Sequence, residues 1–441
     1  MTVETSSLHS EAQIGEKKSA VKPLFLKEKI MNYEKIKTKL EKYNQEHLLV
    51  KYNELTENKK EELLKQISNI NFEQIEELYK KSIKKEEKKD EKIEPIEYID
   101  KVKLSKDEYN KYFSIGAEEI KKGKLGVVTM AGGQGTRLGH NGPKGTFMLG
   151  TTPNKSLFEI LCDGLKRAKE QYGVDIPWYI MTSVENNKET VEFFEKNNYF
   201  DYPKENFKFF IQGELPMLNT AGKILLNEEG LVKQAADGHG GIFEAMFKNN
   251  VVEDMKSRGL EWLFIGPVDN PLVKMVDELL IGIAVSNKTM AAGKSLVKIS
   301  PEEKVGVFCK KNGKPGVVEY TEISEEMANK KNQNGELEYG ESHINCNMFN
   351  IKAIEEIGNN KLPYHSAFKK ANYIDEKGEI VKAQEPNSFK YESFIFDAFE
   401  KLDKMTILRV KREEEFAPVK NSTGIDSAES ARELYNKFHN I

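Results

Sequence analysis

Residues 125–145 constrain the fold most, because they join a short strand directly to a glycine-rich loop. The run "LGVVTM" (125–130) is apolar and β-branched, as is typical of a buried strand. The fifteen residues that follow, "AGGQGTRLGHNGPKG", contain six glycines and only two charged side chains, Arg137 and Lys144. Glycines let backbone N–H groups approach oxygen atoms without a Cβ clash. The stretch therefore predicts a phosphate-binding loop at the end of a strand.

Two common phosphate-binding motifs do not fit this loop. The dinucleotide motif G-x-G-x-x-G would need a third glycine at the position that Leu138 occupies. The P-loop motif G-x-x-x-x-G-K-[ST] needs glycine before its lysine and a hydroxyl residue after it. Here Pro143 precedes Lys144 and Gly145 follows it. The loop therefore indicates a different kind of nucleotide or phosphate site.

Helices and strands alternate after this loop. Ser156 and Glu159 form a capping box that predicts the start of a helix. The patterns that follow favour a strand, a helix and two further strands: "PWYIMTS" (177–183), "KETVEFFEKN" (188–197), "FKFFIQG" (207–213) and "EWLFIGPVDN" (261–270). This alternation predicts an α/β domain with a largely parallel sheet, and such sheets bind ligands beyond the carboxyl ends of their strands.

The N-terminal part of the chain has a different character. Residues 31–94 show apolar residues at helical spacing, and Asn71 and Gln74 resemble a capping box. The run 80–95 mixes charges of both signs and is interpreted as a solvated helix end or linker, with a docking surface for a partner as the alternative. Residues 1–30 are polar and are interpreted as an extension, a leader or a cloning artefact.

Composition narrows the function classes. The formal net charge is −4, so no global field attracts nucleic acid, and any anion site is local. Three cysteines without a C-x-x-C pair argue against a disulfide framework and a cysteine zinc site, and they favour a reducing, cytoplasmic setting. No apolar run approaches the roughly 20 residues that span a bilayer, so we expect no membrane association.

At the level of whole motifs, "MAGGQGTRLGHNGPKG" (130–145) resembles the signature loop of the UDP-sugar pyrophosphorylases, and most closely the UDP-N-acetylglucosamine pyrophosphorylase branch. Further motifs resemble that branch in the same order over about 31–440: "QEHLL" (45–49), "FFIQGELP" (209–216), "DGHGGIFEA" (237–245), "VVEYTEI" (317–323), "FKYESFIFD" (389–397) and "REEEFAPVKN" (412–421). The resemblance implies the nucleotide-diphospho-sugar transferase fold, which is an α/β fold with a Rossmann-like mixed sheet flanked by helices and, here, an N-terminal helical region.

The resemblance also implies an organisation of the chain. The expected parts are a polar extension or leader (1–30), an N-terminal helical region (31–120), a catalytic α/β uridylyltransferase domain (121–385) and a C-terminal segment that completes the site (386–441).

The reaction that the resemblance implies is UTP plus a sugar-1-phosphate giving a UDP-sugar and pyrophosphate. Such a transfer depends on in-line positioning and charge neutralisation. The implied catalytic residues are Arg137 at the β- and γ-phosphates, Lys144 near the α-phosphate and the incoming phosphate, and Asp269 as a ligand of Mg²⁺. The alternative for Asp269 is a turn residue without a metal.

The resemblance assigns the UTP-binding residues as well. The backbone of Ala131, Gly132 and Gly133 would hold the uridine end of UTP. The amide of Gln212 would read the uracil edge, and Gly238 would pack close to the base. Lys144, Asp269 and Lys390 complete the predicted UTP-binding set. For Lys390 the alternative is an ordinary surface lysine.

The predicted sugar-binding residues are His239, Glu319, Tyr320, His343 and Lys420. His239 stands where the acetylhexosamine branch typically has asparagine and where glucose-specific and broad-specificity relatives typically have histidine. Without the resemblance, His239 is read as a surface-turn histidine, the Glu319–Tyr320 pair as part of an edge strand, and Lys420 as a surface residue.

These assignments favour synthesis of UDP-N-acetylglucosamine from UTP and N-acetylglucosamine-1-phosphate. The alternative is a glucose-1-phosphate or broad UDP-sugar pyrophosphorylase, and a more remote one is a nucleotide-sugar-binding protein without catalysis. The expected cofactor is Mg²⁺. The expected partners are UTP and a hexose-1-phosphate, with no nucleic acid or membrane, and the expected state is a monomer, with weak oligomerisation as an alternative.

Overall fold

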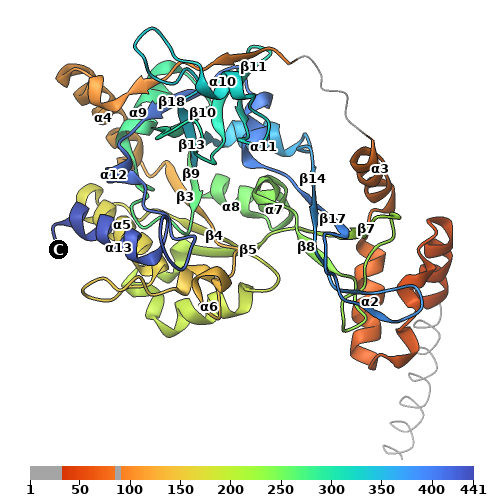
Figure 1. Cartoon of the computed structure of the whole chain (residues 1–441). Helices are drawn as coiled ribbons and strands as arrows, with labels where there is room; N and C mark the ends of the chain where they lie inside the picture. Colours follow the sequence, from red (N-terminus) through yellow and green to blue (C-terminus); the bar gives the residue numbers. More distant parts are fainter. Residues whose placement is uncertain (1–31, 85–90) are drawn as a thin grey trace, which may run out of the picture. The chain divides into compact units, whose positions relative to one another are not determined.

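The computed structural model describes residues 32–84 and 91–441, which form two compact units (Figure 1). The described part of the small unit comprises residues 32–84, 214–235 and 365–391. The large unit comprises residues 91–213, 236–364 and 392–441. The interpretation of residues 1–30 lies outside the described residues.

The small unit combines N-terminal helices with two later segments of the chain. Residues 32–42 are helical, and Asn71 caps the second of the next two helices by accepting a hydrogen bond from Gln74 N. Gln45 joins these helices to the segment 214–235, because its side chain donates to Gly222 O and accepts from Ile224 N. The named elements are α2 (Glu57–Asn69), α3 (Phe72–Ile83), η1 (Glu46–Leu49), η2 (Tyr52–Glu54), β6 (Glu214–Pro216), β7 (Leu218–Asn219), β8 (Gln234–Ala236), β14 (His365–Lys369), β15 (Tyr373–Ile374), β16 (Ile380–Val381) and β17 (Ser388–Glu392).

The large unit is built on an eleven-stranded mixed sheet. Its main path runs β2-β18-β10-β13-β9-β3-β4-β5, and β1, β11 and β12 branch from it. All neighbours on the main path are parallel except β13, which runs antiparallel to both β10 and β9. The strands are β1 (Ile93–Pro95), β2 (Ile99–Asp100), β3 (Leu125–Met130), β4 (Trp178–Thr182), β5 (Phe207–Ile211), β9 (Trp262–Pro267), β10 (Ala291–Val297), β11 (Val307–Lys311), β12 (Lys314–Val318), β13 (Glu341–Asn350) and β18 (Thr406–Arg409).

Helices cover both faces of this sheet. Alternate residues of β3 enter different apolar clusters, Val127 on one face and Val128 on the other, so the strand is buried throughout. Ser156 caps α5 by accepting a hydrogen bond from Glu159 N, as predicted. The helices are α4 (Lys106–Lys121), α5 (Leu157–Tyr172), α6 (Asn187–Lys196), α7 (Ile242–Lys248), α8 (Val251–Ser257), α9 (Glu278–Asn287), α10 (Glu325–Asn329), α11 (Ile351–Gly358), α12 (Arg412–Glu415) and α13 (Ala428–His439).

The predicted fold class is confirmed, and the strands expected from "LGVVTM", "PWYIMTS", "FKFFIQG" and "EWLFIGPVDN" are all present as β3, β4, β5 and β9. The two compact units follow a different division from the linear ranges predicted. Helix α4 lies in the large unit, where its small buried residues Gly116 and Ala117 let it pack closely on α9. The small unit instead gains the segments 214–235 and 365–391, which pair with each other through β7 and β17.

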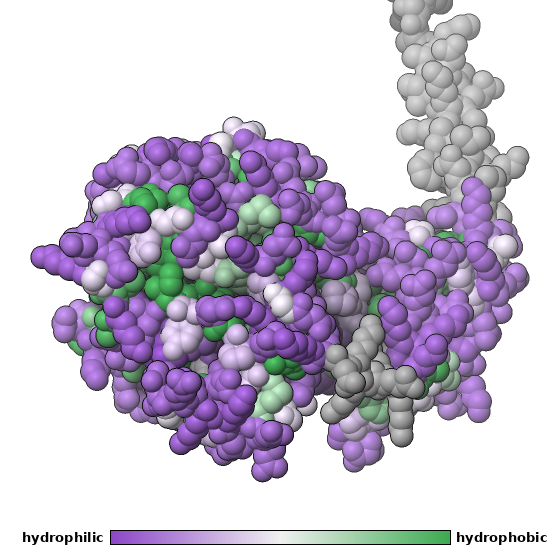
Figure 2. Space-filling model, turned by 90° about the horizontal axis from the view of Figure 1, so that it is seen from above, coloured by the Kyte–Doolittle hydropathy of each residue, from purple (hydrophilic) through white to green (hydrophobic). Residues whose placement is uncertain are grey.

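The polar surface and the free cysteines are consistent with the composition of the sequence. Figure 2 shows mainly hydrophilic residues on the face that it presents. Within the described residues, no helix has both the length and the apolar character needed to cross a membrane. Cys162, Cys309 and Cys346 are all free and buried, and burial raises the pKa of each thiol to about 12.

Candidate active site

The loops that follow four parallel strands gather at one edge of the sheet. Strands β9, β3, β4 and β5 run in the same direction, so their carboxyl ends meet there. Ala131 follows β3, Ser183 follows β4, Gln212 follows β5, and Asp269 comes two residues after β9. His343 reaches the same edge from the opposite direction, because β13 is antiparallel to β9 and begins where β9 ends. The structure therefore brings these residues to one edge of the sheet, and their predicted roles stay predictions.

The glycine-rich loop after β3 is closed by its own backbone. Lys144 N donates to Gly133 O at 3.0 Å, and Gly135 N donates to Gly142 O at 2.9 Å. Asn186, which is fully buried, donates from Nδ2 to Ala131 O at 2.9 Å and to Gly133 O at 3.3 Å. These hydrogen bonds hold the loop through its backbone, so none of them uses the side chain of Lys144.

Lys144 and Asp269 form an ion pair across the site. Lys144 Nζ lies 3.1 Å from Asp269 Oδ2, and the two side chains keep 19% and 17% of their surface exposed. This contact brings the glycine-rich loop to the loop after β9, as the two predicted catalytic roles require. Both side chains stay partly exposed to solvent in this pair.

Gln212 sits at the centre of the predicted nucleotide pocket. It is 8% exposed, and its Nε2 donates to Gly238 O at 2.7 Å. A Cβ added at Gly132 would lie 2.8 Å from Gln212 Oε1, so residue 132 must be glycine for the amide to approach the loop. The structure therefore places Gly132, Gln212 and Gly238 side by side.

Asp237 is a buried carboxylate beside these residues, and sequence reasoning gave it no role. It is 4% exposed, and Gln212 Nε2 donates to its Oδ1 at 3.3 Å. Burial raises the pKa of Asp237 to about 6, because the charged form loses hydration in this position. The signal in the sequence was its place as the first residue of "DGHGG". The role of Asn186 in holding the loop was not predicted either, because a single asparagine after a strand has no distinctive pattern.

Gly238 locks the turn to the C-terminal part of the large unit. Its φ is +87°, and a Cβ there would lie 2.2 Å from Ser393 O. Ser393 N in turn donates to Asp237 O at 2.7 Å. This packing gives a structural reason for glycine at position 238, and the predicted approach to a base stays a prediction.

His239 and His343 both lie beside the Phe396 ring. Their ring centroids are 6.1 Å and 6.0 Å from that of Phe396. His239 Nδ1 accepts a hydrogen bond from Ile395 N, and His343 Nε2 lies 3.2 Å from Asn347 Oδ1. Burial lowers the pKa of His239 to about 4 and that of His343 to about 3, so both rings are neutral at pH 7. His239 is thus half-buried against aromatic rings, and its contact with the sugar stays a prediction.

The structure places Glu319 near His343. A Cβ added at Gly306 would lie 3.0 Å from Glu319 Oε1, and Gly306 O accepts a hydrogen bond from His343 N. Tyr320 follows Glu319 and is 45% exposed. The two residues lie directly after β12, where they form a turn and not part of an edge strand.

The remaining predicted cations differ in their placement. Lys420 is next to Val419, whose N donates to Asp269 O at 2.8 Å, so the backbone of Lys420 is held beside the ion pair. Arg137 is exposed on the short helix η4 (Thr136–Leu138). Lys390 lies on β17, in the small unit, and its assignment to the nucleotide stays a prediction.

A glycine-rich loop that follows a strand and faces a lysine–carboxylate pair suits the phosphates of a nucleotide, so fold and site together define a nucleotidyltransferase. Comparison with protein families narrows this class. A family profile described as UTP–glucose-1-phosphate uridylyltransferase matches residues 70–436, which is most of the chain. The chain belongs to this family, and the predicted enzyme class is confirmed.

Individual relatives point to one branch of the family. The chain is 36% identical to UDP-N-acetylglucosamine diphosphorylase 2 of Arabidopsis thaliana over 91% of its own length and 83% of the relative's. It is 38% identical to the UDP-N-acetylglucosamine pyrophosphorylase of Saccharomyces cerevisiae, over 78% and 74%. The crystal structure of the Trypanosoma brucei UDP-N-acetylglucosamine pyrophosphorylase with an inhibitor is similar with a TM-score of 0.78 and 28% identity, over 91% and 84%.

Proposed function

We propose that this chain transfers the uridylyl group of UTP to N-acetylglucosamine-1-phosphate and releases pyrophosphate. The observation that carries the proposal is the Lys144–Asp269 pair, 3.1 Å apart between the glycine-rich loop and the end of β9. The names of the relatives support the sugar assignment, because the Arabidopsis and yeast relatives are named for N-acetylglucosamine, and three others at 37–38% identity are named for N-acetylhexosamine.

The chemistry is an in-line displacement at the α-phosphorus of UTP. A phosphate oxygen of the sugar phosphate attacks, a new P–O bond forms, and the bond between the α-phosphorus and the bridging oxygen breaks as pyrophosphate leaves. Lys144 neutralises charge on the α-phosphate and the incoming phosphate. Arg137, with its planar guanidinium, is suited to hold the departing β- and γ-phosphates. Positioning and charge neutralisation supply the catalysis, so no covalent intermediate on the protein is needed.

The nucleotide specificity rests on the Gln212 amide. The two N–H groups of the Gln212 amide already bond to Gly238 O and Asp237 Oδ1, so Oε1 is left to accept a hydrogen bond from the base. Uracil offers a donor at N3, whereas the N3 of cytosine is an acceptor. Gln212 lies against Gly132, so a base resting on the backbone of residues 131–133 would meet the amide directly. Exchanging UTP for CTP in the assay tests this assignment.

We further propose that Mg²⁺ binds at Asp269. Mg²⁺ in phosphoryl-transfer sites often takes one or two carboxylates and completes its shell with phosphate oxygens and water. Within the described residues, no group of three or more His, Cys, Asp or Glu side chains is arranged for a metal, so Asp269 would bind the ion jointly with substrate. When bound, the ion would neutralise the charge of the triphosphate. Chelation with EDTA, followed by rescue with Mg²⁺, tests the proposal.

Glucose-1-phosphate is the second candidate substrate, and His239 is the observation that favours it. Its half-buried neutral ring contacts Phe394 and Phe396 and offers Nε2 as its remaining polar atom. The deciding experiment follows pyrophosphate release from UTP with N-acetylglucosamine-1-phosphate, glucose-1-phosphate and galactose-1-phosphate. The highest kcat/KM identifies the sugar, and no turnover with any of them would contradict the proposed function and favour the non-catalytic binding protein.

Two other expectations stay proposals. A cytoplasmic location is supported by three cysteines that are all free and buried. A monomer is the expected state, and light scattering of the purified protein with and without UTP would measure it.

A further inference from the structure

The segment that carries Lys420 is joined to the loop that carries Asp269 by three hydrogen bonds. Asn270 Nδ2 donates to Glu415 O at 2.8 Å, and Ala417 N donates to Asn270 Oδ1 at 2.9 Å. Val419 N donates to Asp269 O at 2.8 Å. Asn270 is 1% exposed, so water does not compete for these bonds. These bonds hold the backbone on the N-terminal side of Lys420 in a fixed position relative to Asp269.

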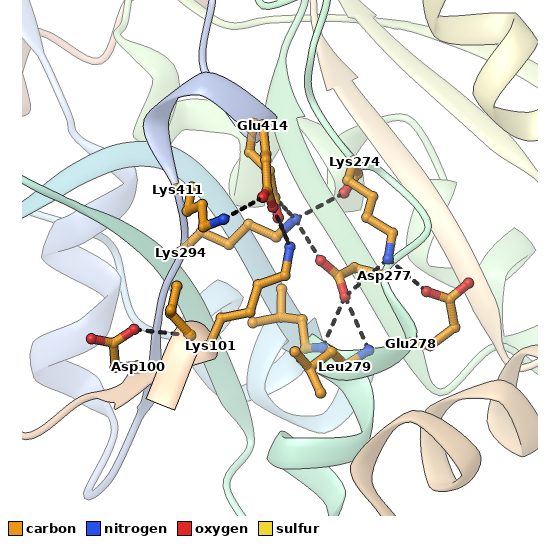
Figure 3. A network of polar contacts seen from close by, with 12 residues as sticks. Asp100, Lys101, Lys274, Asp277, Glu278, Leu279, Lys294, Lys411 and Glu414 are labelled. Atoms are coloured by element: carbon orange, nitrogen blue, oxygen red, sulfur yellow. Dashed lines mark hydrogen bonds and ion pairs between the residues drawn. The ribbon is translucent and has the colours of Figure 1, made fainter. Parts of the chain in front are cut away.

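Behind this junction lies a buried network of charges (Figure 3). Lys294 on β10 is fully buried, and its amino group bonds to Glu415, to Asp277 at 2.6 Å and to Lys274 O at 3.3 Å. These three acceptors match the three N–H groups of the ammonium. Because the amino group of Lys294 cannot move, it holds the carboxylate of Glu415 in place. The backbone carbonyl of the same residue accepts the hydrogen bond from Asn270 Nδ2.

Further hydrogen bonds and ion pairs hold Asp277 and Glu415, the two carboxylates that bind Lys294. Asp277 caps α9, because its Oδ1 accepts from Leu279 N and Leu280 N. Figure 3 shows the amino groups of Lys274 and Lys294 directed at Asp277. Lys101 lies 3.3 Å from the second carboxylate oxygen of Glu415. Lys101 also pairs with Glu414 at 3.0 Å, and Glu414 pairs with Lys411 at 3.1 Å. Four lysines, 101, 274, 294 and 411, thus balance four carboxylates, 277, 278, 414 and 415.

Lys420 is also bonded within its own segment. Lys420 N donates to Asp426 O at 2.7 Å, and Lys420 Nζ lies 4.0 Å from Asp426 Oδ2. Burial raises the pKa of Asp426, and the charge of Asp269 adds to this rise although Lys420 opposes it. The backbone of Lys420, next to Val419, is thus held beside Asp269.

We propose that Asn270, supported by the buried Lys294–Glu415 pair, is a positioning residue that sets the place of Lys420 relative to Lys144 and Asp269. The side chain of Asn270 uses its amide to bond the backbone of the C-terminal segment, so it acts through that segment and does not bind substrate itself. The proposal rests on the proposed function, because Lys420 matters only if a phosphorylated substrate lies at this edge of the sheet. It adds a requirement that two loops 145 residues apart in the sequence be aligned.

The test is a double-mutant cycle on the full chain with UTP and the preferred sugar-1-phosphate. We expect Asn270→Ala and Lys420→Ala each to lower kcat/KM by about 10- to 100-fold, because small displacements of a positioned group are costly. The double variant should then be little worse than either single one, since Asn270 acts through Lys420. Multiplying losses, or a near-normal kcat/KM in Asn270→Ala, would overturn the inference.

A matched pair of charge variants separates positioning from stability. Glu415→Gln disturbs the pair behind Asn270, whereas Glu341→Gln disturbs an equally buried carboxylate that bonds to Arg409 and Ser295. Both should lower the melting temperature, but Glu415→Gln alone should be non-additive with Lys420→Ala in kcat/KM. Equal coupling of both variants to Lys420 would overturn the inference. A wild-type chain with no turnover would overturn the proposed function and this inference with it, while an active wild type with independent effects overturns the inference alone.

Discussion

Two ion pairs of the large unit use the same chemistry in opposite ways. Lys144 and Asp269 keep 19% and 17% of their side chains exposed, and each has bonding capacity left for a ligand. Lys294 is fully buried, and Asp277 and Glu415 use its whole ammonium together with a backbone carbonyl. Burial lowers the pKa of Lys294, but the charges of the two carboxylates outweigh this and raise it above its ordinary value. The comparison teaches that a lysine–carboxylate pair can bind a ligand when it is partly exposed, whereas the same pair stabilises the fold when it is fully buried.

Replacing Lys294 by methionine gives the largest expected effect. The change leaves Asp277 and Glu415 buried without their shared cation, and breaking a buried pair in this way costs about 3–5 kcal/mol in the free energy of unfolding. Urea unfolding followed by circular dichroism measures this loss. Lys101→Ala, which removes a lysine of the same cluster with 24% exposure, is the control and should cost about 1 kcal/mol or less. Equal losses in the two variants would contradict the distinction.

Replacing Lys144 by alanine should act on catalysis and leave the fold nearly intact. We expect kcat/KM to fall by about 100- to 1,000-fold, because a preorganised charge aimed at the reacting phosphate is lost. The melting temperature should change little, since a solvent-exposed pair adds little stability. Asp269→Ala should show the same pattern. Pyrophosphate release and differential scanning calorimetry measure the two effects, and near-normal kcat in either variant would show that the pair is not the reacting centre.

Asp237 is a third case, a buried carboxylate with no cation within ion-pair distance among the described residues. Burial raises its pKa to about 6 in the folded state, so the folded chain holds a proton that the unfolded chain has lost between about pH 4 and pH 6. The stability that this group contributes is therefore present at low pH and is lost as the pH rises through 6.

Asp237→Asn should remove that loss. Relative to the wild type, the variant should gain up to about 3 kcal/mol of unfolding free energy between pH 4 and pH 7.5, because a shift of one pKa unit is worth about 1.4 kcal/mol. Gln212 can still donate to the oxygen of the new amide, so the hydrogen bond survives. Urea unfolding of both proteins at the two pH values measures the difference, and a pH-independent gap between them would contradict the prediction.

The smallest effect should come from a pair on the surface. Lys256 Nζ lies 2.6 Å from Glu355 Oε1, closer than Lys144 lies to Asp269, yet its side chain is 55% exposed. Lys256→Ala should leave the unfolding free energy nearly unchanged, because exposed ion pairs add little stability, and it should leave kcat/KM unchanged. If this pair proved as important as Lys144–Asp269 for turnover, distance rather than location would have to explain the site.

The elements nearest the site could be predicted because their signals are local. Val127 and Val128 belong to a short apolar run, which is sufficient to predict a buried strand, and the glycines of 131–145 mark the loop after it. Lys144 and Asp269 could be assigned because each lies in a motif with a family resemblance. The structure then brought these two residues together across 125 positions of sequence.

The unpredicted residues have roles that depend on partners far away in the chain. Asn186 matters because it reaches the carbonyl of Ala131, and Asn270 because it meets Glu415, 145 residues later. No periodicity or motif encodes such a meeting. The two-unit division could not be predicted for the same reason, since the segment 214–235 joins the N-terminal helices through Gln45.

The buried cysteines make the chain well suited to spectroscopic labelling. Cys162, Cys309 and Cys346 are inaccessible, and their raised pKa values keep the thiols protonated and unreactive toward maleimides at neutral pH. A single cysteine introduced at Ile425, which is 81% exposed, would therefore take a fluorophore selectively without removal of any native thiol. Because Ile425 lies five residues beyond Lys420, the emission of such a probe would report the movements of the C-terminal segment during turnover.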